Sequence, residues 1–169
     1  MFKLPVQQSL QYTMVTPVVG VIAALACAYF IDITGRKPWF SVSFLLGSLP
    51  LFVLAFGGAD SAFNVMLMST LSWFFITTIS LGLYLYSAEI YPTRIRSRGT
   101  GFAAGASKAG GVAIIALVTF GIAAPSIATV ALIGAIPMTL AVILMLAFGV
   151  ETRKRRLEEI TRDEFARAA

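Results

Sequence analysis

Five long apolar runs, separated by short polar connections, constrain this chain more than any other feature. They cover residues 11–31, 39–56, 62–86, 99–124 and 127–150. Each is long enough to cross the ~30 Å hydrocarbon core of a bilayer as a helix, which takes about 20 residues. The runs are continuously apolar rather than alternating segments of about ten residues, which excludes the strands of a transmembrane barrel. The sequence therefore predicts an all-α membrane protein with five transmembrane helices.

Composition agrees with this class and weakens others. The chain is 58% hydrophobic and 12% charged, outside the range of soluble domains. It has no histidine and one cysteine, Cys27, so it lacks a usual metal-ligand cluster, histidine-based catalysis and any internal disulfide. We expect neither an enzyme nor a metal or cofactor. The net charge of +5 lies in the connections and the tail, where membrane topology explains it without a nucleic-acid partner.

Basic residues are concentrated in every second connection. The three basic clusters follow the first, third and fifth runs: Arg36 and Lys37; Arg94, Arg96 and Arg98; and Arg153, Lys154, Arg155 and Arg156. The other connections, "GGADS" and "APS", contain no Lys or Arg. The positive-inside rule then predicts an outside N-terminal segment 1–10, a five-helix region 11–150 and a cytoplasmic tail 151–169. We expect a multi-pass protein of the plasma or inner membrane.

A polar stripe follows the third run at steps of three and four residues, which keeps it on one helix face. Its members are Ser69, Trp73, Thr77, Ser80, Tyr84, Ser87 and Tyr91. One interpretation is that the hydroxyls bond carbonyls of their own helix or a neighbour. The other is a cavity lined by Trp73, Thr77, Ser80 and Tyr84, which the tyrosines favour. The second and fifth runs carry few polar side chains and are expected to support the others from the lipid side.

Charges of both signs meet in the connections "DITGRKP" and "EIYPTRIRSRG" and in the tail "VETRKRRLEEI". Gly35 permits the positive φ of a tight turn, and the acids can pair with arginines from other connections. Such pairs can form a gating network, or the charges can serve topology alone. The candidates are Asp32, Gly35, Arg36, Lys37, Glu89, Arg96, Arg98 and Glu151.

These three segments resemble motifs of the major facilitator superfamily, in its sugar porter and metabolite:proton symporter branch. "D-I-T-G-R-K" is similar to the D-x-x-G-R-[KR] loop, although the glycine usual four residues before the aspartate is Ala28. "E-I-Y-P-T-R-I-R-S-R-G" matches the E-x-x-P-x-x-x-R-x-x-G signature. The tail resembles P-E-T-K-G-x-x-L-E-E-I, with Val150, Arg153 and Lys154 in place of its proline, lysine and glycine.

The resemblance covers essentially the whole chain and implies helices eight to twelve of a twelve-helix transporter. Such a position within a longer transporter would explain why the chain has an odd number of helices and an N-terminal segment outside the cell. It also implies that the first, third and fourth runs face the transport cavity, while the second and fifth are peripheral. The N-terminal half of the transporter would then be a partner missing from this chain.

Lys108 lies ten residues beyond Arg98, about 15 Å deep at 1.5 Å per residue. It shares a helix face with Gly101 and Gly105, a close-packing motif. Three interpretations stay open: an ion pair with an acid outside these runs, a contact with an organic anion, or snorkelling to the interface. Related transporters of small organic acids often have a cation near this place, which favours an anionic substrate.

The sequence thus predicts part of a secondary active transporter that moves a small organic solute, an organic acid or a sugar-like metabolite, by alternating access. Coupling to protons is expected from the resemblance. The alternative is a self-standing five-span accessory or scaffold protein without transport activity.

Overall fold

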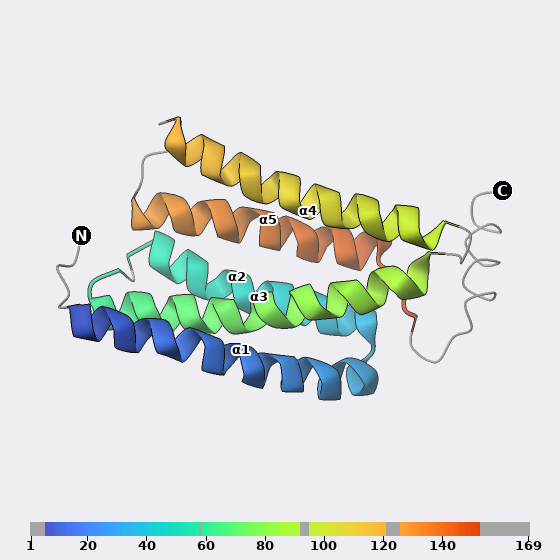
Figure 1. Cartoon of the computed structure of the whole chain (residues 1–169), viewed down its shortest axis with the longest axis horizontal. Coiled ribbons are helices and arrows are strands. Elements are labelled where there is room, and N and C mark those ends of the chain that lie inside the picture. The colour runs from blue at the N-terminus through green and yellow to red at the C-terminus, as the bar shows by residue number, and fades with distance from the viewer. Residues whose placement is uncertain (1–5, 58, 92–94, 121–125, 153–169) are drawn as a thin grey trace.

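Five helices account for nearly all of the structure. The computed structural model describes residues 6–57, 59–91, 95–120 and 126–152. Its helices are α1 (Val6–Thr34), α2 (Arg36–Ala55), α3 (Ala62–Ile90), α4 (Arg96–Thr119) and α5 (Ile127–Phe148). They lie side by side along one direction (Figure 1), and all five are long and apolar enough to cross a membrane. The predicted all-helical membrane fold is confirmed, and the chain is an integral multi-pass membrane protein.

The helix boundaries have local causes. Ser61 begins α3 by accepting a hydrogen bond from the Asn64 amide at 3.2 Å, and Ser126 does the same for α5 with Thr129 at 3.0 Å. Serine is among the preferred residues at this position because its oxygen satisfies a free amide of the first turn. At its other end α3 continues to Ile90, so Glu89 lies on the helix and not in the connection that follows.

A single residue, Gly35, separates α1 from α2. Its φ is 97°, which an L side chain rarely adopts. A Cβ at this position would also lie 2.8 Å from Oε2 of Glu151. Gly35 is therefore required twice, for the backbone turn and for the close approach of the segment that follows α5.

Helix α2 is central to the packing. It lies against α3 and α5, while α1 packs on α3. Small residues allow the close approach: a Cβ on Gly47 would lie 3.0 Å from Phe75, and one on Gly82 would lie 2.9 Å from Phe40. The Ser72 hydroxyl donates to the Gly47 carbonyl at 3.0 Å across the same interface. The second run is thus more than a lipid-facing support, because one of its faces is the most buried surface of this bundle.

The buried cluster lies close to the junction of α1 and α2. It contains Cys27, Ile31, Phe40, Ile79 and Tyr86, with exposed fractions between 0% and 8%. Helix α4 is the opposite case: it touches α3 only lightly, and none of its apolar span is buried among the described residues. The bundle is therefore tightly packed around α2 and open around α4.

Candidate functional site

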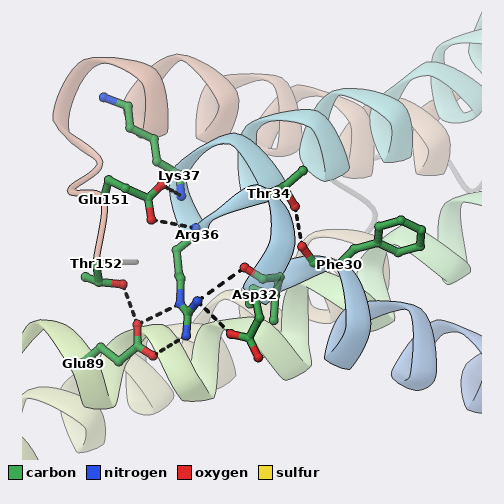
Figure 2. Close-up of polar contacts among 9 residues, drawn as sticks. Phe30, Asp32, Thr34, Arg36, Lys37, Glu89, Glu151 and Thr152 are labelled. Atoms are coloured by element: carbon green, nitrogen blue, oxygen red, sulfur yellow. Dashed lines mark hydrogen bonds and ion pairs between the residues drawn. The ribbon is translucent and has the colours of Figure 1, made fainter. Parts of the chain in front are cut away.

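Arg36 forms the centre of a charge network at the junction of α1 and α2. Its Nε donates to Oε2 of Glu89 at 3.0 Å, and its Nη2 donates to Oε1 of the same carboxylate at 2.8 Å. Its Nη1 lies 2.8 Å from Oδ1 of Asp32, one helical turn earlier. Figure 2 shows the guanidinium between the two acids. Arg36 therefore connects the end of α1, the start of α2 and the last turn of α3.

The two ion pairs differ in strength because they differ in exposure. The side chains of Arg36 and Glu89 are 14% and 33% exposed, whereas Asp32 is 71% exposed. A bidentate pair that is partly shielded from water is stronger than a single-contact pair in solvent. The contact between Arg36 and Glu89 is therefore the principal bond of the network, and Asp32 adds less.

Glu151 caps the first turn of α2 from the other end of the chain. Its carboxylate accepts the Arg36 amide at 2.9 Å and the Lys37 amide at 3.0 Å. The third position of the helix is Pro38, which has no N–H to satisfy. A negative charge at this end also suits the helix dipole. The first-turn donors of α2 are thus satisfied by a side chain more than a hundred residues away in sequence.

Thr152 completes the network. Its hydroxyl donates to Oε2 of Glu89, the same oxygen that Arg36 contacts, and its side chain is buried (Figure 2). We use the name charge network for Asp32, Arg36, Glu89, Glu151 and Thr152. Thr152 was missed by the sequence analysis. The available signal was its position directly after Glu151 in a tail that resembles a family motif.

The other predicted members of the network lie apart from these contacts. Lys37 contributes its backbone amide to Glu151, as described, and Gly35 provides the turn. Arg96 donates from Nε to the Tyr91 carbonyl at 3.4 Å. Arg98 is exposed, and in the described ranges neither Arg96 nor Arg98 forms an ion pair with an acid. The carboxylates of Asp32 and Glu89 both pair with Arg36 instead.

The polar stripe of α3 lies away from the packed interface. Thr77 and Ser80 each donate to the carbonyl four residues earlier, at 2.8 Å in both cases. Trp73 and Tyr84 remain 45% and 68% exposed. A hydroxyl that donates to its own helix can still accept a hydrogen bond. The structure thus shows the hydrogen bonds to the same helix that the first interpretation expects. It also leaves Trp73, Ser80 and Tyr84 exposed and Thr77 half-buried, so these side chains remain available to line a cavity.

Lys108 lies midway along the 24-residue α4 and is exposed. Within the part of the chain that the structure describes, its ammonium forms no ion pair. A Cβ on Gly101 or Gly105 would meet nothing within 4 Å, so the face that these glycines share with Lys108 is open here. A cation at this depth still requires water, an anion or an acid as its neighbour.

A membrane bundle whose connections are tied together by an arginine and two glutamates fits the class of solute transporters that the motifs resemble. Comparison with known proteins confirms the class. The chain belongs to the family described as "Sugar (and other) transporter", whose sequence profile matches residues 1–163. The resemblance to sugar-transporter-like members of the major facilitator superfamily is thereby confirmed.

Three curated relatives illustrate the similarity. The chain is 32% identical over 152 residues to the putative niacin/nicotinamide transporter NiaP of Bacillus subtilis, covering 89% of this chain and 38% of the relative. It is 31% identical over 114 residues to the niacin transporter NiaP of Acinetobacter baylyi, covering 68% and 26%. The carcinine transporter of Drosophila melanogaster is 28% identical over 100 residues, covering 59% and 14%. The chain thus spans less than two fifths of the length of the relatives it matches.

Proposed function

We propose that this chain forms helices eight to twelve of a secondary active transporter that moves a small organic solute by alternating access. The observation that carries the proposal is the bidentate contact between Arg36 and Glu89, at 3.0 and 2.8 Å. This contact joins α2 to α3 at one end of the bundle, and the pair between Arg36 and Asp32 adds the end of α1. Among the described residues no ion pair ties the other end. Family membership supports the same reading.

The charge network is proposed to act as a gate on the cytoplasmic side. Several partly desolvated pairs acting together can bias a two-state equilibrium by a few kcal/mol. Weakening the network should then shift the population toward the inward-open state. By the positive-inside rule, the basic residues of the same connections favour a cytoplasmic location for this end.

For the solute we propose a small organic acid that contacts Lys108. The ammonium lies midway along α4 without an ion pair in the described part of the chain, and niacin, the solute in the names of two relatives, carries a carboxylate. Trp73, Thr77, Ser80 and Tyr84 on α3 would supply aromatic and hydroxyl groups to the same cavity. Proton coupling is part of the proposal, with the coupling acid outside the described helices.

Niacin and nicotinamide provide the decisive test, because they share a ring and differ by a charge. In membranes containing the complete transporter, Lys108→Ala should raise the KM for niacin about tenfold or more, as expected for loss of a charge-assisted contact, and leave the KM for nicotinamide nearly unchanged. Lys108→Arg should be partly tolerated, because it keeps the positive charge but replaces a compact ammonium with a larger, planar guanidinium.

Other outcomes would identify a different role. A reduced folded yield of Lys108→Ala, restored by neutralising an acid elsewhere, would show a structural ion pair. If Lys108→Ala has the parent's KM values and a normal folded yield, Lys108 snorkels to the membrane interface and contacts neither a substrate nor an acid. Correct insertion with no uptake of niacin, nicotinamide, carcinine or a hexose would contradict this substrate range and favour the accessory or scaffold alternative.

The orientation can be tested separately with single cysteines at positions 59 and 162 in a background lacking Cys27. We expect a membrane-impermeant reagent to label position 59 from outside the cell and position 162 only after permeabilisation. Labelling of both positions from the same side would contradict the proposed topology.

A further inference from the structure

Tyr86 makes two hydrogen bonds to the backbone of one residue at the end of α5. Its hydroxyl donates to the Val150 carbonyl at 2.8 Å and accepts the Val150 N–H at 2.9 Å. The ring is 8% exposed and packs against Phe40 with the centroids 5.4 Å apart. Because packing fixes the ring and two bonds fix the hydroxyl, the contact holds Val150 at a defined place against α3.

Helix α5 gives way to extended backbone just before this contact. Helix α5 ends at Phe148, and Gly149 leaves it with φ −63° and ψ 133°. A Cβ on Gly149 would collide with the carbonyl oxygen of Met145 and lie 2.7 Å from its sulfur. Only glycine fits this exit from α5, so the direction of the next residues depends on Gly149 and on the bonds to Val150.

The two residues after Val150 are the ones that reach the charge network. Glu151 caps the Arg36 and Lys37 amides of α2, and Thr152 donates to Glu89 on α3. Both contacts require the backbone at residues 150–152 to run along α3 toward the start of α2. We propose that Tyr86 is the positioning residue that holds this segment, so that α5, α3 and α2 close the network as one unit.

The residue at position 150 decides how many of these hydrogen bonds can form. The family tail that this segment resembles has proline at the position of Val150. Proline has no N–H and could accept from Tyr86 but not donate to it. Two-way bonding between Tyr86 and residue 150 is therefore possible in this chain because a valine stands there.

The inference goes beyond the proposed function and is tested without transport, by hydrogen exchange of the complete protein in lipid nanodiscs. Overlapping peptides that begin and end within residues 33–40 isolate the Arg36 and Lys37 amides from the other amides of this segment, and Pro38 contributes none. Tyr86→Phe keeps the ring and removes both bonds, and should speed exchange at these amides about tenfold. Glu151→Gln should have a similar effect, and the double variant should add little to either single change.

Two further variants make the test specific. Gly149→Ala leaves Tyr86 intact but displaces the exit of α5, and should reproduce the same local increase in exchange even if Tyr86→Phe folds poorly. Tyr29→Phe, which removes a hydroxyl from a tyrosine 66% exposed on α1, is the matched control and should leave exchange at residues 36–37 unchanged.

Unchanged exchange in Tyr86→Phe alongside faster exchange in Glu151→Gln would overturn the positioning role. A uniform increase across all helices would also overturn it, since that result indicates a general loss of stability. If the Arg36 and Lys37 amides exchange as slowly in Glu151→Gln as in the parent, the Glu151 cap does not protect α2, and the proposal that Tyr86 acts through it is overturned. None of these results depends on whether niacin is transported.

Discussion

The charge network and the open face of α3 and α4 contain the same kinds of residue under opposite conditions. In the network, Arg36 is 14% exposed and bonded to two acids, one of them in bidentate geometry. On α4, Lys108 is exposed, with no ion pair in the described ranges, and its neighbouring glycines meet open space. Packed and paired charges set the conformation of the chain, whereas an unpaired charge is free to meet a partner from outside.

The largest expected effect is at the principal bond of the network. Arg36→Ala leaves the Glu89 carboxylate partly buried, and its remaining described side-chain donor is the Thr152 hydroxyl. The loss should lower the free energy of unfolding by about 2 kcal/mol. This is below the ~3 to 5 kcal/mol typical of a fully buried pair, because Glu89 is 33% exposed. Thermal unfolding in detergent would measure it. Arg36→Lys should recover only part of the loss, since lysine cannot form the bidentate contact.

Arg98→Ala is the control for this comparison, because Arg98 is exposed on α4. Its change in stability should stay within about 0.5 kcal/mol. An equal loss in both variants would show that net charge, and not the contact with Glu89, stabilises this end.

A comparable effect on stability is expected at the turn between α1 and α2. Gly35→Ala forces a side chain into φ 97° and places its Cβ 2.8 Å from Glu151, which should cost about 1 to 3 kcal/mol. Gly57→Ala is a matched control, because Gly57 has φ 126° and nothing within 4 Å of its Cβ. The difference between their melting temperatures measures the contact with Glu151. Equal losses would mean that backbone strain alone requires glycine at position 35.

A lesser effect still is expected for Arg96→Ala. The sequence makes Arg96 a candidate partner of the acids, but its described side-chain bond is one 3.4 Å contact to the Tyr91 carbonyl. We expect a change below about 1 kcal/mol and a transport rate close to that of the parent. A loss as large as that of Arg36→Ala would show that Arg96 joins the network in another state of the transport cycle.

The smallest effect on stability is expected on the open face. Tyr84→Phe removes a hydroxyl from a side chain that is 68% exposed, and should alter the melting temperature by less than about one degree. If the cavity proposal is right, the same variant should still change the KM for niacin. A clear loss of stability without a change in KM would instead indicate a structural hydroxyl.

The sequence alone determined the class and the local structure of this protein. The apolar runs required transmembrane helices, because a bilayer core leaves no other way to satisfy the backbone of a continuous apolar segment. The spacing along α3 placed Trp73, Thr77, Ser80 and Tyr84 on one face, because helical periodicity is a local property. The positive φ of Gly35 was also foreseeable from the tight connection around it.

The tertiary structure decided which arginine Glu89 meets. Arg36 lies only four residues from Asp32, so that pair is local, whereas the packing of α2 against α3 selected Arg36 over Arg96 and Arg98 for Glu89. The hydrogen bond from the Arg36 amide to Glu151 joins residues 115 positions apart, and the bond between Tyr86 and Val150 joins residues 64 positions apart. No local sequence pattern encodes contacts at such separations. Such contacts depend on where five helices end relative to one another, and the packing of small residues at Gly47 and Gly82 sets those positions.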